Sequence, residues 1–125
     1  MQKKKMEAIN IEFLKMVLPE VIVNYFELQK QEIQEEKGEE ELHLYFDEIN
    51  IPPDNETQEK IYSKGFYPPS KVQDFPIRDK AVYLHIRRRK WYLLESKKTI
   101  TRDWNLVAEG TRMTESFATF LKETY

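Results

Sequence analysis

The feature that most restricts the folds open to this chain is an alternation of side-chain types between residues 82 and 91. The even positions begin with Val82, Leu84 and Ile86, whereas the odd positions carry aromatic or cationic side chains. Successive side chains of an extended chain point to opposite faces, so this spacing predicts a strand with one buried face. We therefore expect a long strand over Lys80–Leu94.

Shorter alternating runs predict further strands around this one. One begins at Phe26 and another covers Leu42–Phe46, and the acidic run of residues 34–41 is expected to be the loop between them. The other predicted strands are an edge strand at 60–66, a strand at 71–78 and a hairpin partner of the long strand at 99–104.

Both ends of the chain are expected to be helical. The first helix should end before Pro19, and its predicted inner face consists of Met6, Ile9, Phe13, Met16 and Val17. The last helix should begin near a cap at Thr111 or Thr114, and its apolar side consists of Met113, Phe117, Phe120 and Leu121. The β-branched run Val21–Val23 fits either a strand or a helical turn.

These elements predict one α+β domain over residues 1–125, with a central antiparallel sheet of four or five strands between N- and C-terminal helices. The predicted core comprises Phe13, Phe26, Leu44, Phe46, Val82, Leu84, Ile86, Ile100, Phe117 and Leu121. Helical periodicity still continues at Tyr125, so we expect this chain to be the front part of a longer protein.

Charge is distributed very unevenly along the chain. Residues 1–70 carry 8 Lys/Arg and 15 Asp/Glu, whereas residues 71–102 carry 10 Lys/Arg and 3 Asp/Glu. The formal net charge of −2 therefore conceals a basic block beside an acidic one. A basic block of this kind is typical of a surface that contacts an anionic polymer.

Other classes of protein are disfavoured by what the sequence lacks. It contains no cysteine, which excludes disulfides and thiolate zinc sites and predicts a cytoplasmic protein. The spacing of His43 and His85 matches no zinc motif, so no metal or other cofactor is expected. No run approaches the ~18 apolar residues of a membrane-spanning helix. No glycine-rich phosphate loop or nucleophile–base motif is present, so no catalytic activity is predicted for this chain.

The basic block is densest on the long predicted strand. Interleaved rings and cations on its odd face suit phosphate oxygens and the planes of bases or sugars, and the strand should project beyond its sheet at Arg88 and Lys90. The predicted DNA-binding residues are Arg87, Arg88, Arg89, Lys90, Trp91, Tyr83, Lys97, Lys98 and Arg102. A structural alternative stays open, in which the rings cover the outer face and the arginines pair with the acidic half of the chain.

The stretch Val72–Trp91, with its Asp-Phe-Pro step and arginine-rich strand, resembles the N-terminal regions of bacterial insertion-sequence transposases of the Aon type. Residues 63–67 and 103–114 are similar to the same pattern. Related transposases carry an N-terminal zinc ribbon, whose cysteine pairs would stand near Ile61–Lys64 and Trp91–Glu95, where this chain has none. The resemblance thus implies a degenerate, metal-free zinc-ribbon-like region in which packing by residues such as Trp91 and Tyr62 replaces the metal.

The resemblance also implies a function. The acidic catalytic triad of such transposases lies in a later RNase H-like domain, so this chain is expected to be a noncatalytic N-terminal module that holds transposon-end DNA. The implied partners are that DNA and a catalytic transposase domain or subunit, and an oligomer is compatible with both. A function of another class also fits, namely a protein–protein module that docks onto the catalytic subunit or a second protomer.

Overall fold

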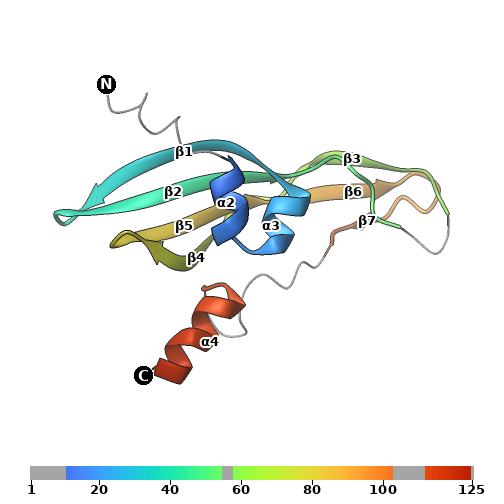
Figure 1. Cartoon of the computed structure of the whole chain (residues 1–125). Helices are drawn as coiled ribbons and strands as arrows, with labels where there is room; N and C mark the ends of the chain where they lie inside the picture. The colour runs from blue at the N-terminus through green and yellow to red at the C-terminus, as the bar shows by residue number, and fades with distance from the viewer. Residues whose placement is uncertain (1–10, 55–57, 103–111, 125) are drawn as a thin grey trace.

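The computed structural model describes residues 11–54, 58–102 and 112–124, and the chain has an α+β fold with two sheets (Figure 1). The described elements are α2 (Ile11–Val17), α3 (Glu20–Tyr25), β1 (Phe26–Glu36), β2 (Glu39–Glu48), β3 (Ile61–Phe66), β4 (Ser70–Ile77), β5 (Lys80–Arg87), β6 (Arg89–Leu93), β7 (Thr99–Ile100) and α4 (Glu115–Thr124). The central sheet has the strand order β1-β2-β5-β4, and the second sheet has the order β3-β6-β7.

The central sheet is mixed, so the prediction of a purely antiparallel sheet is wrong. β2 and β5 run parallel, with Leu44 opposite Leu84, while β1–β2 and β4–β5 are antiparallel. Parallel neighbours require a long connection between them. The connection after β2 includes β3 and leads to the β4–β5 hairpin, whose second strand lies beside β2 and in the same direction.

The acidic run between β1 and β2 forms paired strands, which corrects its prediction as a loop. Glu36 pairs with Glu39 and Glu35 pairs with Glu40, so only two residues make the turn. Those residues are Lys37 and Gly38, with φ angles of 53° and 83°. Two successive positive φ angles match the twist of a two-residue hairpin, and glycine adopts such an angle without steric cost.

The long predicted strand is extended throughout but divides into two strands at Arg88. β5 ends at Arg87 in the central sheet and β6 begins at Arg89 in the second sheet, as expected for a strand that projects beyond its sheet. The carbonyl of Arg88 accepts a hydrogen bond from the amide of Tyr67 at 2.8 Å. The predicted edge strand is confirmed as β3. The predicted hairpin partner is confirmed only over β7, because Thr101 and Arg102 are not part of a strand and residues 103–104 lie outside the described part.

Helices α2 and α3 cover one face of the central sheet (Figure 1), where Leu14, Leu18 and Ile22 are buried. The predicted inner face of the first helix is wrong, because Phe13 is 45% exposed and Met16 is 83% exposed. The predicted residues Met6 and Ile9 lie outside the described residues. The buried stripe has i, i+4, i+8 spacing and continues past Pro19 into α3, which also settles Val21–Val23 as helical.

Seven of the ten predicted core residues are buried, namely Phe26, Leu44, Phe46, Val82, Leu84, Ile86 and Phe117. Ile100 and Leu121 are partly exposed.

Helix α4 is anchored to the edge strand β4 through Thr114. The hydroxyl of Thr114 donates to Asp74 at 2.8 Å, its amide donates to the carbonyl of Gln73 at 2.8 Å, and its Oγ1 accepts from the amide of Phe117 at 3.4 Å. Of the two caps predicted from the sequence, Thr114 is therefore confirmed, whereas Thr111 lies outside the described residues. Burial raises the pKa of Asp74, and the hydrogen bond from Thr114 opposes that rise.

The two sheets are joined by the buried carboxylate of Glu48, the last residue of β2. One oxygen accepts a hydrogen bond from the indole Nε1 of Trp91 at 2.9 Å, and the other accepts from the backbone amide of Arg89 at 3.1 Å. The guanidinium of Arg102 lies 3.9 Å from the same carboxylate. Glu48 and Trp91 both have 0% exposed surface, so this contact holds β6 against the end of β2.

We predict that Glu48→Ala destabilises the protein by about 3–5 kcal/mol, because it removes the partner of the buried Trp91 indole, of the part-buried Arg89 amide and of a nearby cation. Urea unfolding measures the loss, and a Trp104→Phe background makes the fluorescence report on Trp91 alone. Glu35→Ala, on the exposed end of the hairpin, is the control and should stay within about 0.5 kcal/mol of the parent. Equal effects of the two alanine variants would show that Glu48 does not join the sheets.

Candidate functional site

The structure separates the residues predicted to bind DNA into several groups. Tyr83 lies on the central sheet, where its ring is flanked by the ammonium of Lys71 at 4.4 Å and the ring of His43 at 5.2 Å. The remaining predicted residues belong to β5, β6 and the segment that follows them, and their side chains do not share one surface.

Three of the predicted arginines have structural partners. Arg87 makes a bidentate ion pair with Asp47 at 2.7 and 2.6 Å. Arg89 donates to the carbonyl of Glu48 and to the hydroxyl of Ser63, each at 2.8 Å, and Arg102 donates to the carbonyl of Ile51 at 2.6 Å. The alternative in which arginines pair with the acidic half of the chain is therefore confirmed for Arg87, which binds Asp47, and for Arg102, which lies near Glu48.

Trp91 is inside the protein, so its predicted position on an outer face is wrong. It is one of the largest fully buried side chains, and its ring is enclosed beside Glu48. Because the interruption at Arg88 transfers the chain into the second sheet, the odd residues of β6 point toward the packed side.

The opposite side of the second sheet carries rings and cations that contact one another. The rings of Tyr62 and Tyr92 lie 5.5 Å apart, and the ammonium of Lys64 lies 4.3 Å above the ring of Tyr92. Next to them, the guanidinium of Arg88 and the ammonium of Lys90 lie 5.7 and 5.3 Å from the ring of Tyr67. We call this surface the basic tyrosine face, and its members are Tyr62, Lys64, Tyr67, Arg88, Lys90 and Tyr92.

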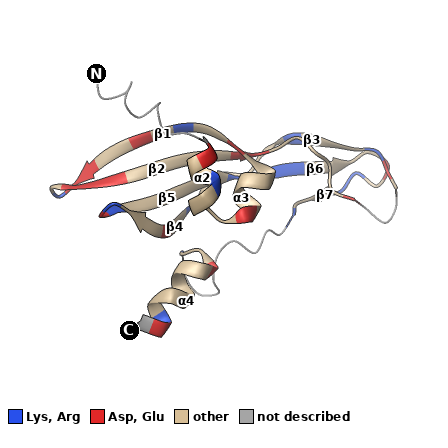
Figure 2. Ribbon diagram, in the orientation of Figure 1, with Lys and Arg blue, Asp and Glu red and all other residues tan. Residues whose placement is uncertain are grey.

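The cations of the basic tyrosine face are not neutralised within the described residues. None of the ion pairs in that part of the chain includes Lys64, Arg88 or Lys90. The predicted residues Lys97 and Lys98 lie in the exposed β6–β7 turn of the same sheet. Figure 2 shows Lys and Arg on the second sheet, whereas Asp and Glu gather at the far end of the β1–β2 hairpin. Lys64, Arg88, Lys90, Lys97 and Lys98 thus form a group of positive charges on and beside the second sheet.

Sequence reasoning missed Tyr62, Lys64, Tyr67 and Tyr92 as members of this surface. The signal for part of it was present, because Arg88, Lys90 and Tyr92 are the even set of the same alternation. The even positions of β5 face the core, however, and only the change of sheet at Arg88 turns the even positions of β6 outward.

A second cluster occupies the face of the central sheet opposite α2 and α3. The ring nitrogens of His43 and His85 share a hydrogen bond of 2.7 Å, and the other nitrogen of His43 lies 3.0 Å from a carboxylate oxygen of Glu41. Tyr45 stacks on His85 with ring centroids 4.3 Å apart. Burial is the main cause that lowers the pKa of His85, with a further contribution from His43 and from the positive charge of Lys71.

We predict that this lowered pKa makes the protein less stable in mild acid. An unfolded histidine titrates near 6.5, so below about pH 6.5 the unfolded chain binds the proton more readily than folded His85 does. The free energy of unfolding should therefore be at its full value above that pH and fall as the pH decreases toward the folded pKa. Lys71, Lys30 and His43 favour the neutral ring and Glu32 opposes them.

Urea unfolding between about pH 7.5 and about pH 5.5 tests this prediction. His85→Gln keeps a neutral hydrogen-bonding side chain at this position and should reduce the slope of stability against pH. An unchanged slope in this variant would assign the acid sensitivity to another group.

No group of three or more metal-ligating side chains occurs among the described residues. None of the described helices has the length and apolar character needed to cross a membrane. Comparisons of the chain with protein-family models, with curated proteins and with solved structures yield no match. The resemblance to transposases therefore stays a prediction, as does the zinc-ribbon-like character. The two stretches where a zinc ribbon would carry its cysteine pairs lie on the paired strands β3 and β6, with Ile61 opposite Leu93 and Ser63 opposite Trp91.

Proposed function

We propose that this chain is a noncatalytic nucleic-acid-binding module that contacts DNA through the basic tyrosine face. The observation that carries the proposal is the set of three cations, Lys64, Arg88 and Lys90, gathered over tyrosine rings without an ion-pair partner in the described residues. Phosphate contacts by such cations supply most of the sequence-independent affinity for DNA.

The chemistry of the face fits a nucleic-acid backbone better than a small anion. Lys64 lies on β3, Lys90 lies on β6 and Arg88 immediately precedes β6, so the three cations are spread along the strands. Tyrosine hydroxyls can donate to phosphate oxygens, and their rings hold the long cationic side chains near the surface. Lys97 and Lys98 add two cations at the β6–β7 turn, whereas Arg87, Arg89 and Arg102 serve mainly as structural partners.

The resemblance to Aon-type transposases supports DNA at transposon ends as the partner and implies that catalysis belongs to another domain or subunit. A protein–protein module is the second candidate. The observation that favours it is the apolar outer side of α2, where Phe13, Met16 and Val17 are exposed. Docking of the catalytic subunit at that side is compatible with DNA on the second sheet.

We predict that the variant Arg88→Ala/Lys90→Ala binds duplex DNA more weakly on every sequence. Its plot of log affinity against log salt should be flatter by about 0.9 for each lost phosphate contact. Fluorescence anisotropy with terminal-repeat and scrambled duplexes at several salt concentrations measures both quantities. Lys15→Ala/Lys122→Ala is the matched control, because it removes the same charge from α2 and α4, and its slope should equal that of the parent.

Arg89→Ala tests whether the two sides of β6 have different roles. Its side chain holds Glu48 and Ser63, so the variant should lose about 1.5–3 kcal/mol of stability and keep the parental salt slope. If the matched control flattens the slope as much as Arg88→Ala/Lys90→Ala does, the binding reflects overall charge and the assignment to this face is wrong. A parent protein that binds neither duplex at low salt would remove the DNA-binding proposal altogether and leave the docking function.

A further inference from the structure

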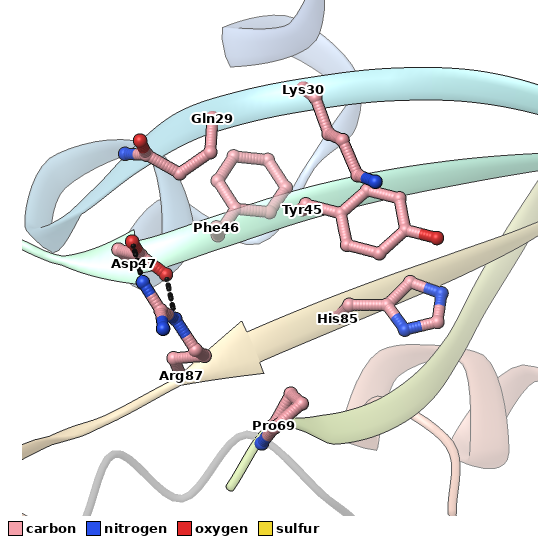
Figure 3. A pocket seen from close by; sticks show the side chains of 8 residues that line it. All are labelled: Gln29, Lys30, Tyr45, Phe46, Asp47, Pro69, His85 and Arg87. Carbon is pink, nitrogen blue, oxygen red and sulfur yellow. Dashed lines mark hydrogen bonds and ion pairs between the residues drawn. The ribbon is translucent and has the colours of Figure 1, made fainter. Parts of the chain in front are cut away.

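A cleft opens on the face of the central sheet that α2 and α3 do not cover. It has a volume of about 270 Å³ and is lined chiefly by Gln29, Lys30, Tyr45, Asp47, His85 and Arg87, with Pro69 immediately before β4 (Figure 3). This volume is slightly below the ~300–1,000 Å³ typical of ligand pockets, which limits the ligand to one small ring system. None of the functions considered above uses this cleft.

The wall of the cleft favours a flat ligand. Tyr45 and His85 stack with ring centroids 4.3 Å apart and planes inclined by 13°. Arg87 adds a planar guanidinium that is fixed by Asp47 on one side and lies 4.2 Å from the ring of Phe66. Aromatic rings and an immobilised guanidinium are the surfaces on which planar heterocycles stack in proteins.

The charges around the cleft nearly cancel, which disfavours an anion as the ligand. Arg87 is neutralised by Asp47 through two short hydrogen bonds. Lys30 lies 4.0 Å from a carboxylate oxygen of Glu32, and its ammonium stands 4.5 Å above the ring of Tyr45. Burial lowers the pKa of His85, which favours the neutral form of its ring. A phosphate would find no net positive charge here, unlike at the basic tyrosine face.

Donors and acceptors nevertheless remain at the rim. The amide nitrogen of Gln29 donates to the carbonyl of Glu27 at 3.2 Å, which leaves the amide oxygen as an acceptor. His85 uses one ring nitrogen toward His43 and has a second nitrogen. Arg87 has another guanidinium nitrogen beyond the two that bind Asp47. A ligand that both donates and accepts hydrogen bonds along one edge would satisfy these groups.

We infer that this cleft binds a single nucleobase, with the ring against Tyr45 and His85 and its polar edge toward Gln29 and Arg87. A nucleobase is flat, uncharged and edged by both donors and acceptors, so it matches the three properties of the cleft together. The base belongs either to a free nucleoside or to an unpaired position of a nucleic-acid strand. The inference goes beyond the proposed DNA contact, because it does not require the basic tyrosine face.

Titration of the full chain with adenosine, guanosine, cytidine and thymidine tests the inference. We expect at least one nucleoside to give saturable NMR shifts of the ring protons of Tyr45 and His85, with no competition from inorganic phosphate. A short single strand of that base, compared with its fully paired duplex, then distinguishes the sources. Tighter binding of the single strand than of the nucleoside identifies an unpaired base, and equal binding identifies the free nucleoside.

Two variants localise the binding. Tyr45→Leu removes an aromatic ring from the wall of the cleft and should weaken the binding of the nucleoside about tenfold through the lost stacking. Gln29→Ala changes an exposed side chain and should weaken it about fivefold through one lost hydrogen bond. Tyr83→Leu is the matched control, because Tyr83 lies on the same face but outside the cleft, and it should bind like the parent.

The inference is overturned if no nucleoside gives a saturable shift up to its solubility limit. It is also overturned if phosphate competes with the nucleoside, or if Tyr83→Leu weakens binding as much as Tyr45→Leu. Circular dichroism of each variant verifies that it is folded, and Gln29→Ala remains informative if Tyr45→Leu does not fold. Because Arg88→Ala/Lys90→Ala should leave nucleoside binding unchanged, a failure of the DNA-binding proposal is distinguishable from a failure here.

Discussion

The rest of the structure depends on the buried carboxylate of Glu48. Removal of a carboxylate from water costs several kcal/mol unless donors surround it, and here the indole of Trp91 and the amide of Arg89 supply them. These bonds hold the start of β6 at the end of β2. They also decide which side of β6 is inside, because Trp91 must face Glu48. Lys90 and Tyr92 consequently face outward, so the basic tyrosine face is a product of this one buried contact.

The same contact divides the cations of the basic block into two kinds. Arg89 and Arg102 lie beside Glu48, and Arg87 lies in the neighbouring ion pair with Asp47, so their charges mainly hold strands together. Arg88 and Lys90 lie on the other side of the chain, and their charged groups contact the ring of Tyr67. Adjacent residues of identical charge therefore differ in role, since the side of the strand decides whether a carboxylate is within reach.

Two surfaces with different physics follow from this arrangement. The DNA contact proposed for the basic tyrosine face is a long-range Coulomb attraction, so it should weaken with salt. The cleft around Tyr45 and His85 has almost no net charge and acts through shape, stacking and hydrogen bonds, which depend little on salt. Its neutrality follows from the Asp47–Arg87 pair and from the burial of His85. One surface suits a backbone of phosphates and the other suits a base.

The sequence by itself determined the features that depend on neighbours along the chain. Alternation was sufficient to identify the strand through Val82, Leu84 and Ile86 and its projection at Arg88, because side-chain direction in a strand is local. Hydrogen bonding at a helix end is also local, so the sequence narrowed the cap of the last helix to Thr111 or Thr114. The count of charged residues along the chain was sufficient to find the basic block. It could not show that Arg87 is held in an ion pair whereas Arg88 is not.

Tertiary structure decided the features that depend on partners distant in the sequence. Both Phe13 and Leu14 fit a helical stripe, and only the position of the sheet made Leu14 the buried one. Alternation cannot say which strand lies beside which, so the parallel pairing of β2 with β5 and the second sheet could not be predicted. The alternation of residues 82–91, taken alone, likewise predicts that Trp91 faces outward. It is inside because a carboxylate 43 residues earlier in the chain requires a donor.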